Sequence, residues 1–251
     1  MSDVRTTNPN LRRRLAYALG FAALCAVLVA VVSLPSADAI TAKVIGRTKQ
    51  TPNPSCPAKN SRDACSAIGS VTGYMTKAAG KKHPFHVFKN GSIVAWAIDL
   101  SRPNKEERNV FATLFSNDAF GKHASARIAV LKAKAHHKYK LVKQSPALDL
   151  QRFLGRKQIF TLDKPLRVRK GQVVALTVPT WTSNFALPVS QKDNEWRSSR
   201  RKGKCNVDKD HQGNIKDSRP QQKVGSERRY DCVYNGGRLL YWAYFVPNKK
   251  G

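Results

Sequence analysis

Residues 165–178 read PLRVRKGQVVALTV and contain two strand patterns separated by a turn. In residues 165–169, leucine and valine alternate with Arg167 and Arg169, which is typical of a strand with one buried side and one solvent-facing side. A Lys-Gly pair ends this pattern. Residues 173–178 are then apolar at both alternating sets of positions, which is typical of a central strand covered on both faces. The stretch predicts a half-exposed strand, a turn and a buried strand.

Other strand patterns surround this stretch. Alternation or short apolar runs predict strands at 71–76, 126–132, 138–144, 158–162 and 238–246. Asn90-Gly91 predicts a hairpin between residues 86–89 and 92–100, because both residue types tolerate positive φ. Strands about every ten residues, without a βαβ rhythm, predict a mainly β fold, an antiparallel β-sandwich.

One short helix interrupts the strands. Asn104 is a helix N-cap candidate, and Glu107 stands three residues later as its capping-box partner. The predicted helix places four apolar side chains on one face: Val110, Phe111, Leu114 and Phe115. Two stretches, 47–67 and 197–231, look irregular, and the second is a long basic and polar excursion.

The first 39 residues have the three parts of a secretory signal. Arg12-Arg13-Arg14 precedes 20 uncharged residues, 15–34, and the small-residue site Ala37-Asp38-Ala39 follows. This pattern predicts cleavage after Ala39. The alternative is an uncleaved membrane anchor, because 20 apolar residues in a helix span a hydrocarbon core of about 30 Å. Both alternatives predict that residues 40–251 form one exported domain, secreted or associated with the cell envelope.

The cysteines agree with export. Beyond Cys25 there are four, and an even number in an exported chain is typical of disulfides. Three pairings are possible, and proximity in the sequence favours Cys56–Cys65 and Cys205–Cys232. The chain has no CxxC motif, so the sequence predicts no zinc site and no other metal or cofactor.

The chain is strongly basic. It has 45 Lys and Arg against 16 Asp and Glu, a net charge of +29. Residues 1–39 contain four Arg and two Asp, so residues 40–251 keep a net charge of +27. Such a charge predicts attraction to polyanions, namely anionic cell-surface polymers or extracellular nucleic acid.

The excursion contains the densest basic run. Five cations lie within eight residues, and they are the candidate polyanion-binding residues: Arg197, Arg200, Arg201, Lys202 and Lys204. The alternative is a solvated loop without a specific ligand. Arg167 and Arg169, on the wet side of their strand, are the next candidates.

Two tryptophans flank the buried strand and the basic run. If Trp181 and Trp196 are exposed, they are candidates for stacking on sugars or bases. The alternative is that both pack at a sheet edge.

The sequence favours no enzyme class. It contains no Gly-x-Ser-x-Gly motif for a nucleophilic serine. A glycosidase requires two facing carboxylates, and none of the acids lies in a recognisable motif. No catalytic residue is therefore assigned.

Four runs carry a family resemblance: 90–96 (NGSIVAW), 126–131 (ARIAVL), 165–171 (PLRVRKG) and 174–181 (VALTVPTW). In these runs, and over about residues 40–250, the chain resembles a group of uncharacterised secreted actinobacterial proteins. The resemblance implies a jelly-roll-like β-sandwich and brings no catalytic residues. The sequence thus predicts an exported binding or structural module of the cell envelope, with a sandwich-fold glycan hydrolase as the alternative.

Overall fold

The structure is a computed structural model that describes residues 42–56, 65–117, 119–207, 210 and 212–248. The predicted signal or anchor, residues 1–39, lies outside the described residues. Within them the fold is mainly β, and the named strands pair antiparallel. The described helices include none with the length and apolar character needed to cross a membrane.

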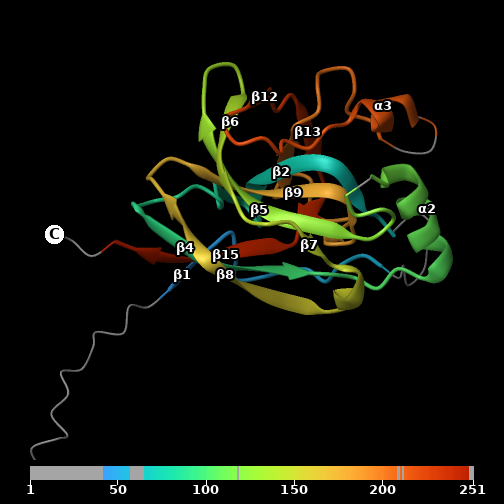
Figure 1. The fold of residues 1–251 in the computed structure, drawn as a ribbon, viewed down its shortest axis with the longest axis horizontal. Coiled ribbons are helices and arrows are strands. Elements are labelled where there is room, and N and C mark those ends of the chain that lie inside the picture. Colours follow the sequence, from blue (N-terminus) through green and yellow to red (C-terminus); the bar gives the residue numbers. More distant parts are fainter. Residues whose placement is uncertain (1–41, 57–64, 118, 208–209, 211, 249–251) are drawn as a thin grey trace, which may run out of the picture. The chain divides into compact units, whose positions relative to one another are not determined.

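Most strands belong to two sheets (Figure 1). The four-stranded sheet has the order β1 (Lys43–Ile45), β15 (Tyr241–Pro247), β4 (Gly91–Asp99) and β8 (Lys157–Val168). The nine-stranded sheet has the order β12 (Glu227–Arg229), β6 (Lys138–Gln144), β5 (Ser125–Ala133), β9 (Val173–Thr182), β2 (Ile68–Ala78), β11 (Glu195–Ser198) and β13 (Cys232–Asn235). Its two short additions are β3 (Lys81–Lys82) on β2 and β7 (Leu148–Asp149) on β5. β10 (Phe185–Ala186) and β14 (Arg238–Leu239) form a separate pair.

The two large sheets contact each other through one hydrophobic core. The Tyr241 hydroxyl of β15 donates to the carbonyl oxygen of Val174 in β9 at 3.1 Å. The Tyr241 ring also stacks on Phe85, with 4.3 Å between ring centroids. Because burial removes water from both rings, these contacts stabilise the sheet-to-sheet interface as well as each sheet.

The predicted buried strand is confirmed. All ten residues of β9 are buried, and the strand lies between β5 and β2. Its polar side chains find partners, since Thr177 shares a 2.9 Å hydrogen bond with Thr72. The predicted turn at Lys170-Gly171 is also present: Gly171 has φ of +84°, and the chain there passes from one sheet to the other.

The predicted Asn-Gly hairpin is wrong. β4 pairs with β15 and β8, and residues 86–89 form no strand. Gly91 has no positive φ; a Cβ on it would lie 2.3 Å from the carbonyl oxygen of Val246. The glycine is thus required by close approach of β15, a role that the dipeptide alone does not distinguish from a turn.

Two other predictions are refined. The strands predicted at 158–162 and 165–169 belong to one strand, β8, whose pairing with β4 shifts register in between. The helix is confirmed as α2 (Lys105–Phe115), with its Asn104–Glu107 capping box. Ala112 and Phe115 are its buried residues, whereas Val110, one of the four predicted apolar side chains, is 53% exposed.

The excursion at 197–231 is less irregular than predicted. It includes part of β11, all of the short helix α3 (Gln212–Asp217) and β12 at the sheet edge. A further helical turn, η1 (Gln151–Phe153), lies between β7 and β8. Both predicted disulfides, Cys56–Cys65 and Cys205–Cys232, are confirmed.

Candidate polyanion-binding surface

The predicted basic run divides into two kinds of side chain. Arg201, Lys202 and Lys204 are exposed on the loop after β11. Arg197 is half-buried, and its Nη1 donates to the carbonyl oxygen of Tyr230 at 3.1 Å. Arg200 is 4% exposed. Three of the five candidates therefore face solvent.

Arg200 joins three parts of the chain. Its Nε donates to Ser218 Oγ at 3.0 Å, its Nη1 to the Tyr234 hydroxyl at 3.2 Å and its Nη2 to the Gly69 carbonyl oxygen at 2.8 Å. These acceptors lie beyond α3, in β13 and in β2 respectively. Since a buried cation is costly without hydrogen bonds, this arrangement assigns Arg200 to holding the excursion on the sheet.

The two tryptophans are buried rather than displayed. Trp181 is 0% exposed, and its Nε1 donates to the Lys122 carbonyl oxygen at 2.9 Å. Trp196 is 3% exposed and stacks on Tyr234 at 4.3 Å between ring centroids. This geometry agrees with the packing alternative, because neither ring offers a free face to a ligand.

The fold adds cations to the exposed part of the loop. Arg219 and Arg228 join Arg201 and Lys204 in a pocket of about 280 Å³, which we call the loop pocket. Burial lowers the pKa of Arg228, and the charges of Arg201 and Arg219 lower it further. One acid, Asp217, also lines this pocket, 3.3 Å from the Lys204 ammonium group.

A second basic surface lies where β5 and β6 meet the end of β8. This basic groove has a volume of about 720 Å³. Seven cations line it, and no acid does: Lys132, Lys134, Lys140, Lys143, Arg167, Arg169 and Lys170. Arg167 and Arg169, the alternative candidates from the sequence, are thus joined by lysines from two other strands.

Strand pairing brings these lysines together. Lys132 in β5 lies opposite Lys140 in β6. Like charges directly opposite on one sheet face destabilise the pair. Beside them, Lys134 lies 3.9 Å from Glu227, an acid that does not line the groove. Glu227, in β12, also lies opposite Lys140, so this one acid partly offsets the lysines. The lining itself keeps seven positive charges, whose mutual repulsion an anionic ligand reduces.

Sequence reasoning missed the lysines of β5 and β6. The signal was present in KYKLVKQ, residues 138–144, where alternate residues face opposite sides of a strand. Grouping them with Arg167 required knowing that the end of β8 lines the same groove as β5 and β6, a long-range arrangement that alternation does not encode.

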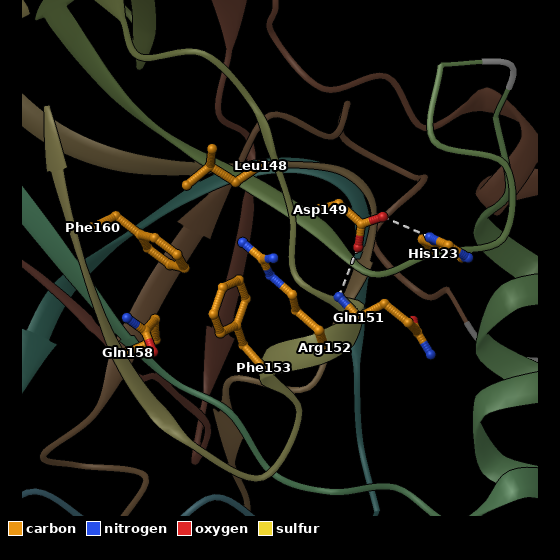
Figure 2. A pocket seen from close by; sticks show the side chains of 8 residues that line it. All are labelled: His123, Leu148, Asp149, Gln151, Arg152, Phe153, Gln158 and Phe160. Carbon is orange, nitrogen blue, oxygen red and sulfur yellow. Dashed lines mark hydrogen bonds and ion pairs between the residues drawn. The ribbon is translucent and has the colours of Figure 1, made fainter. Parts of the chain in front are cut away.

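A third concavity bears on the hydrolase alternative. His123 and Asp149 lie together in a hollow beside η1, with His123 Nδ1 2.6 Å from Asp149 Oδ2 (Figure 2). Asp149 is the one carboxylate among the residues lining it, whereas glycoside hydrolysis uses two. In the part of the chain that the structure describes, no cluster of three or more His, Cys, Asp or Glu is placed to hold a metal ion.

Comparison of the chain with known protein families, with curated proteins and with solved structures finds no significant match. Functional inference therefore rests on the geometry of these surfaces.

Proposed function

We propose that the protein is an exported, disulfide-bonded module that binds anionic polymers of the cell envelope through the basic groove. The observation that carries the proposal is the set of seven cations, contributed by three strands and by the turns after β5 and β8, around a groove with no acid in its lining. Lysine and arginine attract phosphate and carboxylate chains with little demand on sequence or geometry. An extended polymer suits a groove of this kind better than a compact ligand.

The proposed location rests on the N-terminal pattern and the disulfides. A basic segment, an apolar segment and an Ala-x-Ala site favour export, and disulfides persist in oxidising compartments. We further propose that the two sheets form a jelly-roll-like β-sandwich. Its support is the antiparallel pairing, the shared core and an order in which β15, from the end of the chain, lies between β1 and β4.

The experiment compares two variants with equal loss of charge. The groove variant carries Lys132→Gln, Lys140→Gln, Arg167→Gln and Arg169→Gln. The control variant carries Lys49→Gln, Lys81→Gln, Lys82→Gln and Lys192→Gln, four exposed positions that line neither the groove nor the loop pocket. Binding to a 20-base-pair DNA duplex, to polyphosphate and to poly(glycerol phosphate) is measured over a range of salt concentrations.

Each phosphate contact contributes about 0.9 to the slope of log K against log salt on duplex DNA. We expect the groove variant to lower this slope by about two to four, and the control variant by less than one. Equal reductions in both variants would show that attraction is diffuse and has no site. If the parent protein binds the DNA duplex but neither polyphosphate nor poly(glycerol phosphate), its ligand is nucleic acid and the proposal of a cell-envelope polymer is wrong.

A further inference from the structure

The hollow beside η1 combines aromatic, cationic and hydrogen-bonding side chains. It has a volume of about 660 Å³ and draws its lining from the turn before β5, from β7, from η1 and from β8. We call it the Arg152 hollow, because Figure 2 shows the Arg152 guanidinium group extending between Leu148 and the two phenylalanine rings. It shares no lining residue with the basic groove.

The apolar side of the hollow is rigidly supported. The Phe153 ring lies edge-on to Phe160, with 5.2 Å between centroids. Phe160 packs in turn on Trp96, a fully buried residue, at 5.0 Å. Both phenylalanines remain partly exposed. They therefore present a preorganised apolar surface of the kind that the C–H face of a sugar ring contacts.

Arg152 supplies an available charge above this surface. Its guanidinium carbon lies 4.7 Å from the Phe153 ring centroid, and the residue is exposed. Within the described residues no ion pair engages it. A planar guanidinium group held over a ring is suited to bind a carboxylate with two parallel hydrogen bonds.

The polar side of the hollow is held in a fixed orientation. Asp149 Oδ2 contacts His123 Nδ1 at 2.6 Å, while its Oδ1 accepts from the Gln151 backbone N–H at 2.8 Å. Gln151 Oε1 accepts from the Ala124 N–H at 3.2 Å, and its amide nitrogen remains a donor. Gln158 donates to the Ile159 carbonyl oxygen at 2.9 Å and keeps its own oxygen as an acceptor. These groups match ring hydroxyls, which both donate and accept.

We propose that the Arg152 hollow binds an acidic sugar, a hexuronic acid unit. Its carboxylate pairs with Arg152, its ring face packs on Phe153 and Phe160, and its hydroxyls bond to Asp149 and Gln158. A neutral sugar offers the guanidinium group hydroxyl acceptors but no negative charge, and inorganic phosphate makes no use of the aromatic surface. The full set of groups therefore selects a ligand with both a ring and a carboxylate.

The test titrates the exported protein, with both disulfides formed, against sodium D-glucuronate, D-glucose, adenosine monophosphate and inorganic phosphate. Binding is followed by backbone amide chemical shifts. We expect glucuronate to bind at least tenfold more tightly than each other compound, with the shifts centred on η1 and β7. Arg152→Gln is expected to weaken glucuronate binding at least tenfold. Arg152→Lys, which keeps the charge without the planar fork, is expected to give a smaller loss.

Arg156→Gln is the matched control. Arg156 is exposed, lies four residues from Arg152 and does not line the hollow. It is expected to bind glucuronate within twofold of the parent, and a thermal melt of each variant verifies folding. Failure of glucuronate to bind, equal losses in both variants, or glucose, phosphate or the nucleotide binding as tightly as glucuronate each overturn the proposal. The groove variant should retain glucuronate binding, so this result and that of the polyanion experiment are independent.

Discussion

The basic groove and the excursion at 197–231 are both rich in positive charge, yet they use it differently. In the excursion, arginines donate to carbonyl oxygens: Arg197 to Tyr230, Arg219 to Ser218 and Arg228 to Arg219. In the groove, four of the seven cations stand on strands whose backbone is already paired, and the other three lie in the turns that follow β5 and β8. The density of cations along a sequence therefore does not show which of them are available to an anionic ligand. What matters is whether neighbouring acceptors already engage them.

The difference follows from the apolar content of the two regions. The strands of the groove are held by Ile128, Leu131 and Leu141, which are all fully buried. The excursion has few such residues and relies on polar contacts. Gln221 donates to the Tyr139 carbonyl oxygen at 3.1 Å and accepts from the Tyr230 hydroxyl at 2.8 Å. Arginine serves here as a structural crosslink because hydrophobic burial is scarce.

The strongest way to separate the two regions is to open the Cys205–Cys232 disulfide. The chain-entropy relation gives about 3.6 kcal/mol for the 28-residue loop that it closes. The double variant Cys205→Ser, Cys232→Ser should lose about that much unfolding free energy, measured by urea denaturation. Its slope of log K against log salt for DNA binding should remain steeper than that of the groove variant, since the groove lies on other strands.

The matched control opens the other disulfide. Cys56→Ser with Cys65→Ser removes the crosslink that closes a loop of ten residues, for which the same relation gives about 2.7 kcal/mol. A larger loss here than at Cys205–Cys232 would contradict the view that the excursion depends on its crosslink.

The next test removes one crosslinking arginine. Arg200→Gln leaves acceptors in Gly69, Ser218 and Tyr234 without their charged donor, and we expect a loss of about 2–4 kcal/mol in unfolding free energy. Arg201→Gln, at the exposed neighbouring position, should change stability by less than about 0.5 kcal/mol. If both variants lose the same unfolding free energy in urea, burial does not distinguish the role of Arg200 from that of Arg201.

The groove should respond in the opposite direction. Lys132→Gln relieves repulsion with Lys140 and should raise the unfolding free energy by about 0.2–1 kcal/mol. The same change should lower the DNA-binding salt slope by about 0.9. Lys49→Gln, the exposed control, should alter neither quantity appreciably. A destabilised Lys132→Gln variant would mean that this lysine is structural, as in the excursion.

The smallest expected effect concerns pH. Burial lowers the pKa of His86, and the nearby His83 lowers it further. The unfolded chain therefore binds the proton more readily, so stability is lost as pH falls from about 6.5 toward the lowered pKa. His86→Gln should flatten this part of the stability profile by less than about 1 kcal/mol, because the ring is partly solvated. Melting curves of the parent and the variant from pH 7.5 to 5 measure this difference. If stability depends on pH equally in both proteins, His86 is not the group responsible.

Local signals in the sequence were sufficient for much of the fold. The apolar run of β9, the capping box of α2 and the spacing of the cysteines each depend on nearby residues, and each was predicted. The prediction of a hairpin at Asn90-Gly91 was wrong because the close approach of β15 requires the glycine at position 91. β15 lies about 150 residues away in the chain.

The candidate site was harder to predict for the same reason. The basic run at 197–204 is dense in the sequence, but a fold-dependent set of acceptors engages Arg197 and Arg200. The lysines of the groove are scattered in the sequence and gather only through strand register. Sequence reasoning identified Arg167 and Arg169 because alternation reveals which side of a strand is wet.

Strand β6 contacts both the basic groove and the excursion at 197–231. Lys140 lines the groove, while the adjacent Tyr139 turns to the other face and bonds through its hydroxyl to Tyr74. On its edge β6 pairs with β12, the last strand of the excursion. A polymer bound in the groove would contact the Lys140 face of β6. This contact would stabilise the hydrogen bonds between β6 and β12. Slower deuterium exchange at the β6 and β12 amides would then report occupancy of the groove without any label on the ligand.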